Sequence, residues 1–394
     1  MHNRKTCSRI GRSNCWLNSV AKHITITLLA FMVVGMFAMF ALNLSFLNPI
    51  AQVVEDFEMT DIYYQILQDT DEVEVDDEVT IVDMSELYSR RELAATLHDI
   101  EAMKPKVVGV DIVFEGLKED SVGDEMMREV ASKYNNMVYS YKLLDYVNDS
   151  TGYADAVHSF FAAEGTNEGF TNMQRNLYGG MKRQLSLGQK HLGKVVPSFI
   201  TQVVNGLEST RTLSAEEREL NINFTPKRFR TIEPDSICQH PEWITDKVVL
   251  FGATKDEQDM HYTPLGKMAG VELLAYSVTT LLEQSEVWTP GIWLTVLLSF
   301  SLVLLTEILS SAYKTFAKGR RSRLLRFVMS MSFVWSILLF FWMSFWVWVA
   351  FILFCKCGVS LNLGWVLSAM AMLVLAENIY NECSTAIKEK NNGK

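Results

Sequence analysis

The chain has 394 residues, a formal net charge of −10 at pH 7 and a pI near 5.3. Such an acidic surface repels phosphates, so nucleic acid is excluded as an expected partner. Hydrophobic residues make up 49% of the chain, and they are concentrated in four long runs, which indicates a membrane protein rather than a soluble one.

The four apolar runs cover residues 24–47, 292–313, 327–354 and 359–380. Each run reaches the roughly 20 residues that an α-helix needs to cross a bilayer. The first run is longer than the apolar core of a signal peptide and is followed by no small-x-small cleavage site, so we expect an uncleaved anchor. The sequence therefore predicts one transmembrane helix, a large domain at 48–291, and three further transmembrane helices.

Basic residues predict the orientation. They are concentrated in the N-terminal segment 1–23, in the loop 314–326 and in the tail 381–394, whereas the domain at 48–291 holds about twice as many acidic as basic residues. Short basic flanks stay in the cytoplasm. We therefore expect a multi-pass protein of a bacterial inner membrane, with the domain periplasmic or extracellular and the loop 314–326 either against anionic lipid or docked on a partner.

Three smaller features have more than one interpretation. The acidic stretch 69–78 is either a solvated charged linker or a calcium site. Cys355 and Cys357 flank Lys356 in the short outer turn after the third helix, and this C-x-C turn is either structural or binds metal or senses redox state. Glu307 and Glu377 lie in apolar runs near their cytoplasmic ends, where snorkelling or pairing with the basic loop would stabilise them.

The domain itself begins with a helical lead-in from residue 51 and then alternates strands with helices. We expect strands at 79–84, 106–114, 136–144, 220–224 and 246–254, and helices at 91–103, 124–133 and 270–282. The run 106–114 is almost continuously apolar, as in a parallel strand covered on both faces. Together these elements predict an α/β fold with right-handed crossovers, a sheet-and-helix domain inserted between one N-terminal and three C-terminal transmembrane helices.

Sequence blocks in this domain resemble the CHASE type-two family of extracellular sensory domains. The blocks are, in chain order, Val79–Asp83, Val107–Phe114, Gly169–Asn172, Gly180–Arg183, Pro197–Ser198, Ile222–Phe224 and the ending Lys247–Ala275, which reads KVVLFGATKDEQDMHYTPLGKMAGVELLA. The resemblance implies a sensory domain. Family members usually continue into a cyclase or kinase module after the last helix. We expect a stand-alone form here, because the given sequence holds no such module.

Candidate site residues lie at the carboxyl ends of the predicted strands, where ligands bind in open α/β sheets. Asp83 ends the first strand, Asp111 lies in the second, and Asp259, His261 and Thr263 follow the strand that ends near Gly252. The family blocks add further positions, namely Asn172, Arg183 and Thr254.

Each of these candidates has a structural alternative. Asp111 is either a ligand-binding group or is satisfied by backbone amides, and Asp259 with Thr263 either contacts ligand or fixes the loop before Pro264. Arg183 is either a clamp for an anionic ligand or the ion-pair partner of Asp111.

No catalytic motif stands out, because G-x-S-x-G, the P-loop and H-E-x-x-H are all missing from the sequence. We therefore expect no enzyme, no resident metal and no cofactor. The leading hypothesis is an envelope sensor or ligand-binding membrane protein that passes a signal to a separate partner. The alternatives are a membrane scaffold whose outer domain docks another protein, and a metal-dependent hydrolase that uses Asp83, Asp111 and Asp259.

Overall fold

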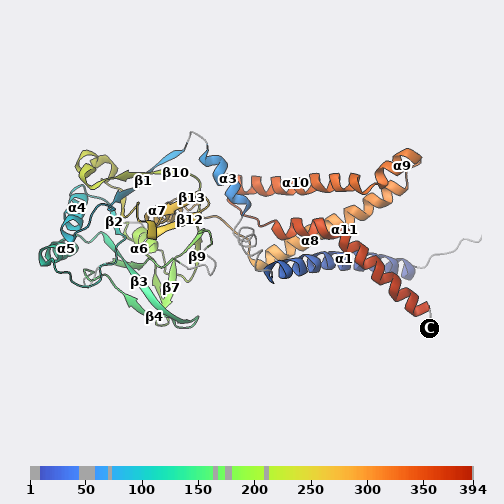
Figure 1. The fold of residues 1–394 in the computed structure, drawn as a ribbon, viewed down its shortest axis with the longest axis horizontal. Helices are drawn as coiled ribbons and strands as arrows, with labels where there is room; N and C mark the ends of the chain where they lie inside the picture. The colour runs from blue at the N-terminus through green and yellow to red at the C-terminus, as the bar shows by residue number, and fades with distance from the viewer. Residues whose placement is uncertain are drawn as a thin grey trace, which may run out of the picture. The chain divides into compact units, whose positions relative to one another are not determined.

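In the computed structural model, residues 9–43, 58–69, 73–162, 167–173, 180–207 and 213–392 are described (Figure 1). The chain divides into two compact units. The sheet unit is Asp61–Trp288, and the helical unit combines Met1–Thr60 with Thr289–Lys394.

The sheet unit is built on a nine-stranded sheet in which the strand order is β10-β1-β11-β2-β3-β4-β7-β8, with β5 also paired to β3. The strands are β1 (Glu74–Asp83), β2 (Val107–Val110), β3 (Met137–Asn148), β4 (Gly152–Val157), β5 (Asn167–Phe170), β7 (Gly188–His191), β8 (Lys194–Pro197), β10 (Lys227–Ile232) and β11 (Val248–Gly252). From β10 to β3, and on to β5, every neighbouring pair is parallel. The predicted α/β class is confirmed.

Two small antiparallel sheets and five helices complete the sheet unit. The small sheets pair β6 (Gln184–Ser186) with β9 (Glu219–Asn221) and β12 (Met260–Thr263) with β13 (Gly266–Ala269). The helices are α3 (Met59–Gln68, which begins in the helical unit), α4 (Arg90–Ala102), α5 (Ser121–Lys133), α6 (Phe199–Gly206) and α7 (Gly270–Leu282). Short 3-10 helices are η2 (Pro234–Gln239), η3 (Pro241–Trp243) and η4 (Glu257–Asp259).

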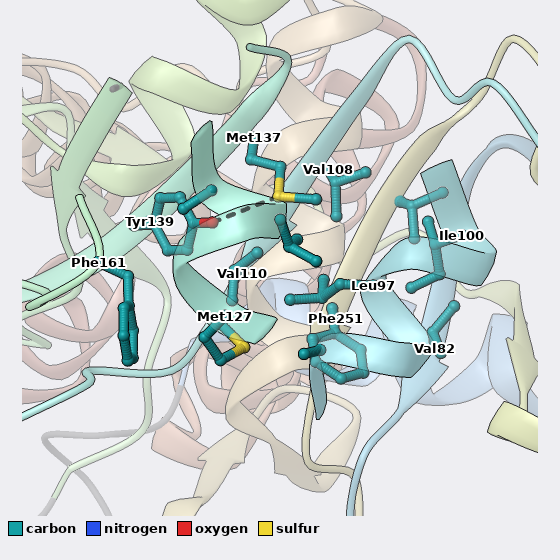
Figure 2. Packing of buried hydrophobic residues seen from close by; sticks show 14 of the residues in the cluster. Val82, Leu97, Ile100, Val108, Val110, Met127, Met137, Tyr139, Phe161 and Phe251 are labelled. Carbon is teal, nitrogen blue, oxygen red and sulfur yellow. Dashed lines mark hydrogen bonds between the residues drawn. The ribbon is translucent and has the colours of Figure 1, made fainter. Parts of the chain in front are cut away.

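The parallel strands are apolar on both faces because helices cover both faces. Val108 and Val110 of β2 join one buried cluster with Leu97 of α4 and Met127 of α5 (Figure 2). Between them, Gly109 faces the opposite side, where a Cβ would lie 2.9 Å from the Phe199 ring of α6. The near-continuous apolar run that predicted a doubly covered strand is therefore confirmed.

The acidic stretch 69–78 is not a charged linker, since β1 starts at Glu74. Asp76 is buried there and accepts hydrogen bonds from the Val79 N–H at 2.8 Å and from Thr279 Oγ1 of α7 at 3.2 Å. Residues 70–72, which the calcium interpretation also used, lie outside the described residues. Strand β1 can extend into the acidic run because Asp76, its buried acid there, gains hydrogen-bond partners from the fold, while Glu74, Asp77 and Glu78 are exposed.

The helical unit contains α1 (Arg9–Asn43), α8 (Ile292–Lys318), α9 (Arg323–Ser330), α10 (Ser332–Cys357) and α11 (Gly364–Asn392). Among the described residues, three segments are long and apolar enough to cross a membrane, namely Ser19–Met39, Ile292–Lys318 and Phe333–Cys357. Helix α11 covers most of the predicted fourth run, but Glu377 and the asparagines beside it make it more polar. A fourth crossing therefore stays a prediction.

Two predicted helix boundaries in the helical unit differ from the structure. Helix α8 continues through Lys318 and α9 begins at Arg323, so much of the basic stretch 314–326 is helical. Cys355 and Cys357 are exposed in the last turn of α10 rather than in a turn between helices. The residue that caps the helix is Gly358, whose φ of +62° lies in the left-handed region that favours glycine.

Polar side chains join α8 to three other helices of the unit. Glu307 pairs with His23 of α1, Lys314 pairs with Glu377 of α11, and Trp342 Nε1 of α10 donates to Thr306 Oγ1 at 3.0 Å. Pairing with the predicted basic loop is confirmed for Glu377. Glu307 uses a histidine of the first helix instead, a partner that only the packing of the helices could select.

Candidate functional site

The candidate residues gather where the parallel strands end. Asp83 ends β1 and pairs in register with Gly252, the last residue of β11, after which Thr254 follows. Asp111 directly follows β2, and Asn172 lies two residues beyond β5. Because parallel strands all end at one edge of the sheet, the register brings these residues to the same edge.

Asp83 fastens the loops after β1 and β11 together. Its side chain is only 1% exposed, and its Oδ1 accepts from the backbone N–H groups of Ser85 and Thr254, both at 3.0 Å, and from the Ser85 hydroxyl. Lys255 Nζ lies 3.3 Å from its Oδ2. Burial alone would raise the pKa of Asp83, but the hydrogen bonds from Ser85 and Thr254 outweigh it and lower the pKa to about 2. Asp83 is thus a permanent anion committed to loop structure.

Asp111 has the opposite environment. Its carboxyl group makes no hydrogen bond and no ion pair within the part of the chain that the structure describes, so the expected satisfaction by backbone amides is wrong. Burial, and then the charge of Asp259, raise the pKa of Asp111 to about 7, while Lys142 and His261 oppose that rise. An unpartnered carboxyl with so high a pKa is typical of functional sites.

Asp259, His261 and Thr263 belong to the connection between β11 and α7. His261 Nε2 lies 3.3 Å from Asp259 Oδ1. The Asp259 carboxylate packs directly on Gly270, the first residue of α7, where a Cβ would come within 2.1 Å of it. Thr263 Oγ1 donates to the Gly266 carbonyl at 2.9 Å, so it stabilises the β12–β13 turn.

The two remaining candidates have structural partners. Asn172 binds the Leu143 backbone of β3 at both ends, accepting from its N–H and donating to its carbonyl, each at 2.7 Å. Arg183 Nη2 pairs with Asp61 Oδ2 at 2.6 Å. The predicted ion pair between Arg183 and Asp111 is therefore wrong, because the helix α3 supplies a nearer carboxylate.

An open pocket of about 1420 Å³ lies at this edge of the sheet unit. Its lining includes Asp111, Asn172, Asp259 and His261, whereas Asp83, Arg183, Thr254 and Thr263 do not line it. Acidic side chains outnumber basic ones in the wall. Half of the predicted candidates thus face one pocket, and the other half hold the loops and strands around it.

The polar pocket residues that were missed from the sequence include Ser140 and Lys142 of β3 and Gln189 of β7. A signal for the first two was present, since Ser140 and Lys142 interrupt the otherwise apolar and aromatic run 137–144. Ser140 is 0% exposed, and among the described residues its Oγ has no hydrogen-bond partner. Oε1 of the buried Gln189 likewise has no partner in the described part of the chain.

A metal centre built on Asp83, Asp111 and Asp259 has no support in the geometry. Within the described residues, no group of three or more His, Cys, Asp and Glu side chains is close enough to hold a metal ion. The Asp83 carboxylate is already used by Ser85 and Thr254, which leaves Asp111 and Asp259 as a pair of carboxylates in the pocket wall.

These features define a class of protein: an α/β domain with an acidic pocket at the carboxyl ends of its strands, in a chain that also carries helices long and apolar enough to cross a membrane. A family model of the CHASE2 domain matches residues 27–308, which is more than half of the chain. The chain therefore belongs to the CHASE2 family, a family of sensory domains, and the resemblance seen in its sequence is confirmed. No curated protein and no solved structure matches the chain significantly.

Proposed function

We propose that this chain is a bacterial envelope sensor that binds a small ligand in the pocket at the carboxyl ends of β2, β3 and β5. The observation that carries the proposal is Asp111, an unpartnered carboxyl group in the wall of an open pocket of a sensory-family domain. Pockets with a few convergent polar groups and perturbed pKa values are the usual ligand sites. The proposal assigns the chain no catalytic step, metal or cofactor.

Helix α8 is the proposed carrier of the signal. It follows the sheet unit in the chain, and its Thr306, Glu307 and Lys314 each bind a different helix. A shift of α8 must therefore either break these contacts or move α1, α10 and α11 with it. In the proposal, ligand binding acts as a signal by favouring one arrangement of these helices over another.

The signal then passes to a separate partner protein through the basic segment around α9 or through contacts between helices. Two arginines of this segment have contacts within the chain: Arg320 stacks on Phe316, 3.8 Å from the ring centroid, and Arg326 donates to the Arg320 carbonyl at 2.7 Å. We therefore choose Arg321 and Arg323 for substitution, so that these contacts are kept. Crosslinking in native membranes should recover a partner with the wild type and clearly less of it with the R321Q/R323Q double variant. Recovery of no partner at the helices or at the basic segment would favour the scaffold function, in which the sheet unit docks another envelope protein.

The orientation is testable with native cysteines. Cys238 of the sheet unit and Cys383 of α11 are both exposed. Two variants are compared, one with Cys238 as its single cysteine and one with Cys383. Cells whose outer envelope is permeabilised but whose inner membrane is intact are treated with a membrane-impermeant maleimide, and the labelling of the two variants should differ. Cys238 should be labelled and Cys383 should react only after lysis. Labelling of Cys383 before lysis would contradict the proposed cytoplasmic position of the C-terminal segment.

Transmission through α8 is testable at Glu307. The E307Q variant keeps the size of the side chain but removes its charge from the pair with His23. We expect E307Q to change partner crosslinking while the sheet unit still folds, whereas E382Q, an exposed position on α11, should leave crosslinking unchanged. Equal partner crosslinking in E307Q and E382Q would show that the His23–Glu307 pair takes no part in transmitting the signal.

A further inference from the structure

The chemistry of the pocket narrows the class of ligand. Asp111 follows β2 and Ser140 follows Tyr139 of β3, and since Val110 and Tyr139 are paired in register, Asp111 and Ser140 are the next neighbours across these strands. Asp259 acts on Asp111 through its charge. The lining of the pocket thus combines two carboxyl groups with a buried hydroxyl whose oxygen has no hydrogen-bond partner among the described residues.

The pocket lining has acceptor atoms and negative charges that lack partners, so it should favour a ligand with hydrogen-bond donors and positive charge. Carboxylates accept only, and Gln189 Oε1, a second buried atom without a partner, is also an acceptor. Two of the basic residues in the wall are already neutralised, because Lys190 pairs with Glu217 at 2.7 Å and Arg218 with Glu286 at 2.6 Å. Lys142 is exposed and forms no ion pair with Asp111 among the described residues.

A ligand that fills this pocket displaces water from the two carboxylates. A carboxylate that loses water without gaining a partner costs several kcal/mol, so an anionic ligand is disfavoured beside Asp111 and Asp259, and a neutral hydroxyl compensates only in part. A bound cation compensates in full when it also donates hydrogen bonds. A bare metal ion fits poorly, since no cluster of three metal-binding side chains exists among the described residues.

We propose that the pocket binds a small organic molecule through a protonated amine, held between the carboxylates of Asp111 and Asp259 with the Ser140 hydroxyl as a third acceptor. An ammonium group has three N–H donors and no acceptor, which matches three oxygen acceptors. This inference rests on the proposed ligand-binding function and specifies its chemistry.

The test compares ligands that share a shape and differ in charge. The full chain in lipid nanodiscs is titrated, by calorimetry and by saturation-transfer NMR, with glucosamine, N-acetylglucosamine and glucuronate. Ethanolamine and ethylene glycol form a second, smaller pair of amine and neutral twin. We expect at least one amine to bind about tenfold or more tightly than its neutral twin, which corresponds to about 1.4 kcal/mol, and glucuronate to show no binding.

Two pocket variants and one control locate the effect. D111N keeps the shape of the side chain but removes the charge, and S140A removes the buried hydroxyl, so both should reduce the preference for the amine. D235N removes the same charge from an exposed residue of η2 outside the pocket, and it should leave the preference unchanged.

The outcomes separate the two proposals. If the neutral or acidic sugar binds best and D111N abolishes that binding, the pocket is a ligand site but the amine assignment is wrong. If neither amine binds better than its neutral twin, or if D235N acts like D111N, the amine proposal is overturned. Partner crosslinking and cysteine labelling are independent of both results.

Discussion

Replacing Asp111 by asparagine tests the environment on which the site depends. The carboxyl group has a pKa of about 7 in the folded chain against 3.8 for an ordinary aspartate. The folded state therefore binds more protons than the unfolded state between about pH 4 and pH 7. Stability from this group is greatest at low pH and is lost as the pH rises through the folded pKa. Asparagine does not titrate, so the stability of the D111N variant does not fall with rising pH on account of residue 111.

The size of the effect follows from the shift. One pKa unit corresponds to about 1.4 kcal/mol, and the difference of about three units sets an upper limit of about 4 kcal/mol. Part of the shift is already expressed at pH 5, so the stability of D111N relative to wild type should rise by about 2.6 kcal/mol between pH 5 and pH 8. For a domain of this size that is a difference in Tm of about 5–10 °C.

Thermal melts by circular dichroism, on the full chain in nanodiscs at several pH values, measure this difference directly. Other titrating groups, such as the buried Glu101 whose pKa burial raises to about 7, contribute equally to both proteins and cancel. D235N is the control and should show no pH-dependent difference from wild type. A Tm difference between D111N and wild type that is the same at pH 5 and pH 8 would refute the argument that the folded environment raises the pKa of Asp111.

Two further predictions concern structural residues near the site. Substituting Arg183 by alanine removes an ion pair with the buried carboxylate of Asp61 and should destabilise the domain by about 3–5 kcal/mol in denaturant titrations. The R91A variant, which loses an exposed ion pair, should be destabilised by less than about 1 kcal/mol. A loss as small as that of R91A in the R183A variant would show that Arg183 is not a structural residue. Substituting Gly169 by alanine places a Cβ within 2.4 Å of the α6 backbone and should lower the free energy of unfolding by about 3 kcal/mol or more, as measured from Tm. The control G291A has nothing within 4 Å of its Cβ and should be neutral. A stable G169A variant would mean that α6 does not approach β5 so closely.

The sequence by itself determined the elements whose signals are local. Apolar runs of sufficient length produce helices regardless of their neighbours, so α1, α8 and α10 lie where hydropathy predicted them. Helix α7 matches its predicted range of 270–282, and α4 ends before Pro105 as expected, because a proline disfavours helical backbone in the residue before it. The β-rich runs likewise predicted β1, β2, β3 and β11, although the short strands β4–β8 carried too few residues to be predicted.

Only the tertiary structure decided which polar groups meet. Strand β11, from late in the chain, lies between β1 and β2, and this insertion brings Asp259 close enough to raise the pKa of Asp111. Packing between distant elements likewise pairs Arg183 with Asp61, His23 with Glu307, and Asn172 with the Leu143 backbone. A sequence shows that a residue can donate or accept, but the partner depends on distances across strands and helices that are far apart in the chain, and those distances are fixed only when the apolar surfaces pack.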